Sequence, residues 1–258
     1  MNSLFIGHTR IKLHEVNSTN TYAIELLKQE KVYEGTLIYS LNQTNGRGQR
    51  GNNWQSEPFK NLTFSIVLTP HFLPISNQFL LTQAVSLAIC DFVAALDNTG
   101  KLNDKIAIKW PNDILLNNKK VCGILIENSI RETSIQHTVV GVGINVNQKK
   151  FDLFPTQASS LSNEFEEEFD TEEILAKICT QIDKRYLQIR NQNGQNQVRE
   201  GYLGKLKGLG LEQQFMLNTK LVDGVIKGVS PIGELLVVLN GEDEFRKFGF
   251  KEIQLVVA

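Results

Sequence analysis

The chain has 258 residues, of which 41% are hydrophobic and 21% charged, as is usual for a soluble globular protein. Its 27 basic and 28 acidic residues give a net charge of −1, which excludes a global electrostatic attraction to nucleic acid or to an anionic membrane. Any anion that the protein binds is therefore expected at a local cluster of basic residues. The length allows one large domain or two smaller ones.

The cysteines and histidines follow no metal-binding or disulfide pattern. Cys90, Cys122 and Cys179 are far apart, odd in number and each in an apolar context, so we expect buried, reduced thiols. The four histidines are scattered, which argues against a histidine metal site. The apolar run 4–6 is too short for a signal peptide and nothing later approaches a membrane span, so we expect no membrane partner and a cytoplasmic location.

The first elements are a strand and a capped helix. Apolar and polar residues alternate over 10–16, as in a half-buried strand. Ser18, Thr19 and Asn20 then precede a helix, and one of the polar side chains here is expected to cap it. A helix N-terminus also offers free N–H groups, so these residues are either a cap alone or a cap and a ligand contact.

An unusual polar segment, residues 43–54, lies between short strands predicted at 36–40 and 62–68. It contains three glycines and two arginines, Gly46, Gly48, Gly51, Arg47 and Arg50. Glycine lets the backbone lie close to a ligand, and arginine supplies donors that suit carboxylate and phosphate. The spacing matches neither the phosphate-binding loop nor the dinucleotide fingerprint. We expect a mobile segment that an anion orders, with a solvated surface turn as the alternative.

The middle of the chain predicts a helix and then a strand that ends at a proline. Residues 78–96 repeat apolar side chains at helical spacing, which predicts a largely buried helix. The strand that follows, within 106–113, must end or lie at a sheet edge, because Pro111 cannot donate to a ladder. A strand terminus therefore holds four residues of interest, Lys109, Trp110, Asn112 and Asp113.

Residues 114–127 predict a β-hairpin. Its turn holds Asn117 and Asn118, which tolerate the left-handed conformations of a tight turn. Lys120 begins the return strand, either as a charge that protects a sheet edge or as a site residue.

The strand predicted at 139–147 contains two glycines on one face. Gly141 and Gly143 share that face because side chains alternate with period two, and Asn145 shares it too. A glycine pair weakens a strand, so we expect a ligand or a packed helix to approach this face closely.

The last part of the chain predicts a helix and a separate β-rich unit. After a loop over 151–161, the acidic run 164–169 is expected to be solvated, and Asp170 with Glu173 fits a capping box. The helix is expected to run out in the polar stretch 191–197, which we interpret as the approach to a domain boundary. Five short β-prone runs then predict a small barrel or meander with no visible catalytic cluster.

Five of these stretches together resemble the biotin protein ligase family. In the family's order they are residues 17–20, 43–54, 109–113, 120–127 and 141–147. The resemblance covers most of residues 10–160 and implies an α+β fold, in which a mixed β-sheet carries helices mainly on one face. Lipoyl ligases and class II aminoacyl-tRNA synthetases share this scaffold. The resemblance assigns residues 1–205 to a catalytic domain that binds biotin and ATP, and residues 206–258 to an SH3-like β-barrel.

The resemblance implies a two-step reaction. The biotin carboxylate attacks the α-phosphate of Mg–ATP to give biotinyl-5′-AMP and pyrophosphate, and a lysine of a biotin carboxyl carrier protein then attacks the mixed anhydride. ATP and Mg²⁺ act as co-substrates, with no tightly bound cofactor. Independently of the family, two anions that must meet require fixed positive charge, for which Arg47, Arg50 and Lys120 are the candidates.

The resemblance also implies residue roles. Lys120, which would bridge the biotin carboxylate and the phosphate, and Arg47, which would hold the carboxylate or the adenylate, are the expected catalytic residues. Biotin is expected to contact Ser18, Thr19, Asn20, Gln43, Gly46, Arg47, Gly48, Gln49, Lys120, Gly123 and Gly141. ATP is expected to contact Arg47, Arg50, Asn52, Trp54, Asn112, Asp113, Lys120 and Asn145, with Asp113 as a Mg²⁺ contact. Trp54, Phe151 and Phe154 are candidate adenine contacts or plain packing residues.

Two departures from the family bear on this reading. Gln49 and Asn52 occupy positions where some members have arginine, so fewer charge-assisted bonds are expected to hold the adenylate. Too few residues precede Ser18 for the N-terminal helix-turn-helix domain of repressor ligases, so we expect a monofunctional ligase without operator binding.

The resemblance also bears on the oligomeric state and on the substrate. Family members are often homodimers, although no stretch of this sequence marks an interface. The alternatives are a lipoate or octanoate ligase on the same scaffold and a non-catalytic biotin sensor. A nucleic-acid-binding module that uses Arg47 and Arg50 is disfavoured, because the chain has no basic surplus.

Overall fold

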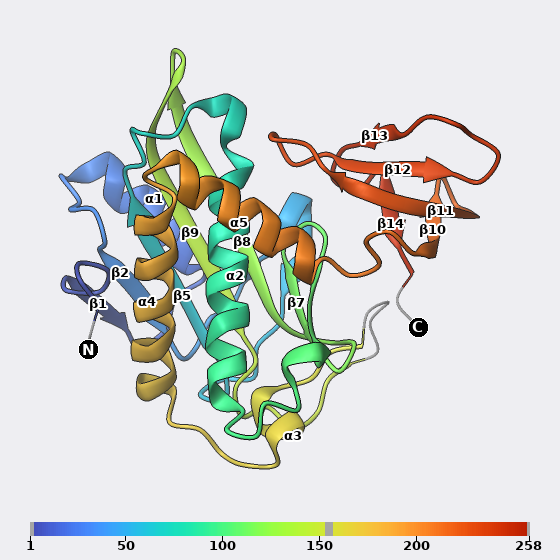
Figure 1. Cartoon of the computed structure of the whole chain (residues 1–258). Coiled ribbons are helices and arrows are strands. Elements are labelled where there is room, and N and C mark those ends of the chain that lie inside the picture. The colour runs from blue at the N-terminus through green and yellow to red at the C-terminus, as the bar shows by residue number, and fades with distance from the viewer. Residues whose placement is uncertain (1–2, 153–156, 257–258) are drawn as a thin grey trace.

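The computed structural model describes residues 3–152 and 157–256. Its larger part is built on a seven-stranded mixed sheet in the order β1-β2-β5-β9-β8-β7-β6 (Figure 1). β1 and β2 pair in parallel, and the other neighbours pair antiparallel. In chain order the strands are β1 (Arg10–Leu13), β2 (Leu37–Ser40), β5 (Leu62–Leu68), β6 (Ile106–Lys109), β7 (Asp113–Leu116), β8 (Lys119–Arg131) and β9 (Ser134–Ile144).

The helices lie mainly on one face of this sheet. They are α1 (Thr19–Gln29), α2 (Phe79–Leu96), α3 (Leu161–Phe165), α4 (Thr171–Gln188) and α5 (Gln192–Lys205). α2, α4 and α5 pack together on one face, and α1 lies on the other (Figure 1). The side chains of β2 alternate accordingly: Leu37 and Tyr39 join the large core under α2, whereas Ile38 packs with Ala23 of α1. The expected α+β fold is confirmed.

α2 is the central helix of the core. By length and composition the segment Ile75–Leu96 could cross a membrane, so the expectation that nothing approaches a membrane span is wrong. In the fold, however, 78% of its most apolar window is buried, and α2 packs against α4 and α5. The three cysteines lie in the same core as free thiols, as expected. Burial raises the pKa of Cys90 and Cys179 to about 12.

A five-stranded antiparallel sheet follows, in the order β13-β12-β11-β10-β14. The five β-prone runs are confirmed as β10 (Glu212–Leu217), β11 (Lys220–Val229), β12 (Leu235–Leu239), β13 (Arg246–Phe248) and β14 (Ile253–Leu255). The sheet docks on the larger part through Trp110, whose Nε1 donates to the Gly233 carbonyl at 2.9 Å. The Trp110 ring also lies 5.4 Å from the ring of Phe250.

α5 corrects the interpretation of residues 191–197. This polar stretch does not lead away from the fold but starts another helix, which Asn191 caps by accepting from the Gly194 N–H at 2.9 Å. α5 buries Gly194, Val198 and Tyr202, and this apolar face is too narrow to give a clear helical pattern in the sequence. The Tyr202 hydroxyl donates to the Pro111 carbonyl at 3.1 Å and so ties α5 to the turn between β6 and β7.

The acidic run 164–169 is not fully solvated, contrary to expectation. The Glu164 side chain is 5% exposed, and its carboxylate accepts from Asn117, Lys119 and Ser159. Glu164 thereby fastens the turn of the β7–β8 hairpin, where Asn117 has positive φ as predicted, to α3. Burial raises the pKa of Glu164, but the hydrogen bonds from its three partners outweigh burial and hold that pKa below its ordinary value.

We predict that Glu164→Gln destabilises the fold at neutral pH by about 1–3 kcal/mol, because an amide replaces a charged acceptor. Since folding lowers the pKa of Glu164, its contribution is present above the ordinary glutamate pKa and is lost as the pH falls through the folded value. Urea unfolding at pH 7 and at pH 3 should therefore show a smaller difference from wild type at pH 3. Glu168→Gln, exposed in the same run, is the control and should cost less than about 0.5 kcal/mol. An equal cost of Glu164→Gln at both pH values would contradict this role.

Candidate functional site

A pocket of about 830 Å³ lies on the sheet face that α1 partly covers. Its floor is a row of directly paired residues from five adjacent strands, Thr63, Gly143, Gly123, Asp113 and Lys109. Directly paired residues of an antiparallel sheet point to the same side, so the whole row faces the pocket. Two of the five are glycines, which leaves the floor low at its centre.

The polar segment 43–54 and the C-terminal sheet form two of the pocket walls. The segment folds into a small hairpin of β3 (Gly46–Arg47) and β4 (Asn53–Trp54), joined by the short 3₁₀ helix η1 (Gln49–Gly51). Its mobility stays a prediction. The C-terminal sheet, in which the sequence shows no catalytic cluster, lines the pocket with Ile253, Gln254 and Leu255 of β14, and the connection from β13 to β14 adds Phe250 and Lys251.

The paired glycines of β9 are approached closely, as predicted. A Cβ at Gly141 would overlap the side-chain amide of Asn20, which comes from the first turn of α1. A Cβ at Gly143 would overlap the indole of Trp54, and one at Gly123 would lie 3.1 Å from the same ring. The Trp54 indole therefore lies over the glycine centre of the floor. Its Nε1 is buried and has no hydrogen-bond partner among the described residues.

A β-bulge brings Lys120 to the pocket. β8 is an interior strand, so Lys120 does not protect a sheet edge. Cys122 pairs with Ile114 of β7, but Lys120 pairs with the next residue, Leu115, so Val121 is an extra residue. Val121 and Cys122 both face the core, and Lys120 and Gly123 both line the pocket. The bulge thus reverses the face that strict alternation would give Lys120.

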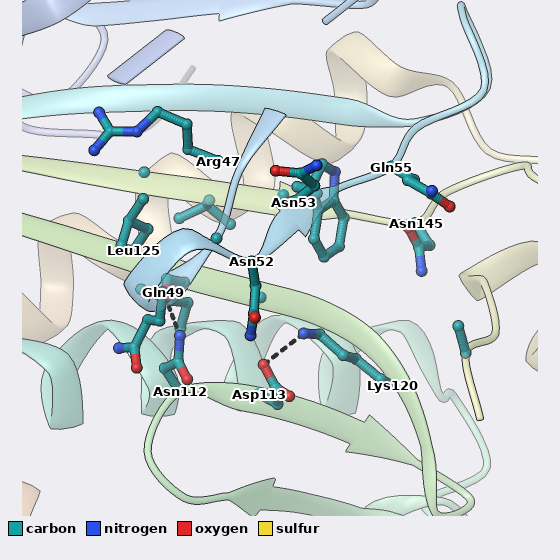
Figure 2. A pocket seen from close by; sticks show the side chains of 18 of the residues that line it. Arg47, Gln49, Asn52, Asn53, Gln55, Asn112, Asp113, Lys120, Leu125 and Asn145 are labelled. Atoms are coloured by element: carbon teal, nitrogen blue, oxygen red, sulfur yellow. Dashed lines mark hydrogen bonds and ion pairs between the residues drawn. The ribbon is translucent and has the colours of Figure 1, made fainter. Parts of the chain in front are cut away.

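The Lys120 ammonium is paired and lies beside an aromatic ring. Its Nζ lies 2.7 Å from Asp113 Oδ1 and 5.6 Å from the centre of the Trp54 ring (Figure 2). Lys109 lies next to this pair in the floor row and is 7% exposed. Burial lowers the pKa of Lys109, the Asp113 carboxylate opposes this, and the Lys120 charge adds to it.

The start of α1 forms a polar cluster at the other end of the pocket. Ser18 caps the helix, its Oγ accepting from the Thr21 N–H at 3.4 Å. Gln43 Oε1 accepts from the Thr19 N–H at 2.9 Å, and the hydroxyls of Thr19 and Ser65 are 2.8 Å apart. The cluster therefore does more than cap α1: it links the helix to the polar segment and to the sheet.

Arg47 lies apart from Lys120. Figure 2 shows its guanidinium pointing away from the Lys120–Asp113 pair. Arg47 instead forms an ion pair with Glu127 of β8, with Nη2 2.8 Å from Oε1. The structure thus does not bring the two expected catalytic residues together, and each of them is paired with a carboxylate.

The other predicted site residues differ in position. Those that also line the pocket are Gly48, Gln49, Asn52, Asn112 and Asn145. Backbone carbonyls orient two of these side-chain amides: Asn112 Nδ2 donates to the Ile124 carbonyl, and Asn145 Nδ2 donates to the Ser159 carbonyl. Gly46 lies outside the lining, where a Cβ would overlap the Trp54 carbonyl. Phe151 lines the pocket, while Phe154 and the side chain of Arg50 lie outside the described part of the structure.

Several lining residues were not predicted from sequence. The main ones are Asn53, Gln55, Leu125, Gln148, Lys150 and the C-terminal residues Phe250, Lys251, Ile253, Gln254 and Leu255. Gln148 and Lys150 come just after the predicted strand 139–147, which contains Gly141 and Gly143. Their position at the end of a strand next to a predicted site could have identified them. No such signal marks the C-terminal residues, because their role depends on the docking of one sheet on another. Within residues 3–152 and 157–256, no three His, Cys, Asp or Glu side chains form a group that could hold a metal ion.

Comparison with known proteins identifies similar sequences. The profile of the biotin/lipoate A/B protein ligase family matches residues 13–145. The bifunctional ligase/repressor BirA of Bacillus spizizenii is 35% identical over 185 residues, which make up 70% of this chain and 54% of that protein. The biotin–[acetyl-CoA-carboxylase] ligase of Paracoccus denitrificans is 28% identical over 235 residues, covering 87% of this chain and 92% of that protein.

Solved structures are similar over nearly the whole chain. The biotin protein ligase from Aquifex aeolicus in complex with biotin and ATP has a TM-score of 0.77 and 26% identity, covering 97% of this chain and 100% of that chain. By contrast, this chain spans about half the length of the BirA proteins from Bacillus spizizenii and Bacillus subtilis, 54% and 52%.

We predict that Gly141→Ala destabilises the protein by about 1–3 kcal/mol, because its Cβ would overlap the Asn20 amide. In an Asn20→Gly background the obstructing amide is absent, so the same substitution should cost at least about 1 kcal/mol less. Urea unfolding of the four proteins measures this coupling. Gly204→Ala in α5 is the control, since nothing lies within 4 Å of its Cβ position, and it should be neutral or stabilising by up to about 1 kcal/mol. Additive costs of the two pocket substitutions would contradict the close approach.

Proposed function

Because this chain belongs to the biotin/lipoate A/B protein ligase family, we propose that it is an ATP-dependent biotin–protein ligase. It would convert biotin and Mg–ATP to biotinyl-5′-AMP and pyrophosphate, and then transfer biotin to a lysine of a biotin carboxyl carrier domain. The observation that carries the proposal is the position of Lys120, on the pocket floor beside Trp54 and Asp113. The similarity to the Paracoccus denitrificans ligase over 92% of its length supports the same activity.

The first step brings two anions together. The ionised biotin carboxylate attacks the α-phosphorus of ATP, and the bond to pyrophosphate breaks, so no general base is needed. The main requirement is fixed positive charge between carboxylate and phosphate, which is worth most in a site sheltered from water. Lys120 meets this requirement, because its side chain is 28% exposed and it shares the pocket floor with Lys109.

We assign the two ends of the pocket to the two substrates. The cluster at the start of α1 offers donors and acceptors for the polar ring of biotin, chiefly Ser18, Thr19, Asn20 and Gln43. The Asn20 amide and the Trp54 indole already lie against Gly141 and Gly123, so the biotin rings would pack beside these two side chains. The nucleotide would contact Asn112, Asp113 and Asn145, with Asp113 as the protein contact of the Mg²⁺ that accompanies ATP.

The second step transfers biotin to an amine. A carrier lysine attacks the mixed anhydride, forming the amide and releasing AMP. Because water would hydrolyse the anhydride, a cover is needed, and the hairpin β3–β4 over the pocket is suited to supply it. Gln49 and Asn52 of this wall hold the intermediate without added charge. Arg47, through its donors, is the proposed contact of the carboxylate or adenylate.

The proposal also covers the domain boundary, the location and the partners of the chain. We propose a catalytic domain over residues 1–205 and a small β domain over 206–258, since the two sheets lie on either side of this boundary. A cytoplasmic location, a carboxylase carrier as partner and the absence of a nucleic-acid partner are part of the same proposal. A homodimer stays a prediction from the resemblance alone.

The proposed activity is tested by ATP–pyrophosphate exchange with the purified protein and Mg²⁺. Exchange should require biotin and should not occur with lipoate or octanoate. Exchange with lipoate or octanoate instead would keep the chemistry and move the substrate. No exchange with any acid, from folded protein, would favour a biotin sensor.

We predict that Lys120→Ala lowers the rate of biotin-dependent exchange by roughly 10²–10³-fold, because it removes the charge that preorganises the two anions. Thermal unfolding should change little, since the Lys120–Asp113 pair is partly exposed. Lys177→Ala removes a lysine from an exposed pair on α4 and should keep the full rate. A Lys120→Ala rate within twofold of wild type would contradict the role of Lys120.

A further inference from the structure

Glu127 is a partly buried carboxylate that the proposed reaction does not use. It follows Gly123 and Leu125 on the pocket side of β8, and its side chain is 25% exposed. Both of its oxygens are occupied by Arg47: Oε1 lies 2.8 Å from Nη2, and Oε2 lies 3.4 Å from Nη1. This two-point contact fixes the plane of the guanidinium as well as its position.

Asn20 holds the Glu127 carboxylate from the side of the sheet. Asn20 Nδ2 donates to Glu127 Oε2 at 2.8 Å and to the Leu125 carbonyl at 3.3 Å. Its Oδ1 accepts from the Ser65 hydroxyl at 2.6 Å. Both partners of the nitrogen can only accept, so the amide has one satisfactory orientation. Asn20 is 3% exposed and lies where Gly141 has no side chain, so this support is rigid.

Arg47 is by contrast a long side chain on a short surface hairpin. Its side chain is 46% exposed, and apart from Glu127 its hydrogen-bond partner among the described residues is the Thr21 hydroxyl, 3.5 Å from Nη1. An exposed arginine loses conformational freedom when it binds a ligand, and a contact that orders it beforehand removes that loss. Two contacts to Glu127 leave further N–H groups of the guanidinium for a ligand.

We propose that Glu127 is a positioning residue that acts through Arg47. A chain of contacts links the sheet to the Arg47 guanidinium at the biotin end of the pocket: Ser65 donates to Asn20, Asn20 donates to Glu127, and Glu127 pairs with Arg47. It holds the guanidinium in one orientation. Because Glu127 and Arg47 form a one-to-one ion pair, Arg47 contributes directed donors, whereas Lys109 and Lys120 lie around one carboxylate, Asp113, and together contribute net positive charge. This inference rests on the proposed function, in which Arg47 contacts the biotin carboxylate or the adenylate.

The test is a double-mutant cycle in ATP–pyrophosphate exchange. Glu127→Ala should raise the KM for biotin by roughly tenfold and change kcat less, because the effect lies in ordering Arg47 before binding. In an Arg47→Ala background, Glu127→Ala should change KM by less than about twofold. Glu127→Gln keeps an acceptor for Arg47 and should recover part of the loss. Glu173→Ala, which breaks an exposed ion pair with Lys177 on α4, is the control and should leave KM unchanged.

Each outcome decides the inference. Additive effects of Glu127→Ala and Arg47→Ala in an active, folded protein would overturn the role of Glu127 and leave the proposed ligase activity standing. A kcat loss with unchanged KM would overturn it in the same way. A wild-type protein without biotin-dependent exchange would overturn the proposed function and this inference with it. Urea unfolding of each variant separates a loss of fold from a loss of positioning.

Discussion

The β-bulge at Val121 is the local constraint on which the pocket depends. Without it, Lys120 would face the core and Val121 the pocket. Three backbone hydrogen bonds from the surrounding chain hold the bulge: Lys120 N–H donates to the Gln157 carbonyl, the Lys120 carbonyl accepts from the Ser159 N–H, and the Asn145 N–H donates to the Val121 carbonyl. These backbone hydrogen bonds compensate for the strand pairing that the bulge disrupts. They therefore hold the Lys120 ammonium at a defined position in the pocket.

The two faces of the large sheet have different roles: one mainly stabilises the fold, and the other forms the pocket floor. One face buries a continuous apolar core under α2 and α4. The other carries small or polar residues along the row from Thr63 to Lys109, with Gly143 and Gly123 at its centre. A glycine in a strand buries no side chain and loses more conformational entropy on folding than other residues do. This face therefore contributes less to the stability of the fold than the apolar face does. The Trp54 indole packs over Gly143 and Gly123, so this part of the sheet is covered although the two glycines have no side chains.

Much of this arrangement could be predicted from local pattern, and the rest depends on contacts between distant residues. The Asn117 turn and the Gly141–Gly143 face follow from backbone preference and period two, and the structure bears both out. The same period puts Lys120 and Gly123 on opposite faces, and the bulge that overrides it leaves no sequence signal. Arg47 and Glu127 are 80 residues apart, so their pairing appears only in the fold.

The paired cations also bear on selectivity. An unpaired ammonium or guanidinium in a half-buried pocket would be costly to keep from water and would attract any anion. Here Asp113 pairs with Lys120 and Glu127 pairs with Arg47, but Lys109, Lys150 and Lys251 also line the pocket, so its lining has more basic than acidic side chains. A ligand that satisfies several fixed donors at once gains more than a small free anion does, so shape and donor geometry act together with charge in selecting what this pocket binds.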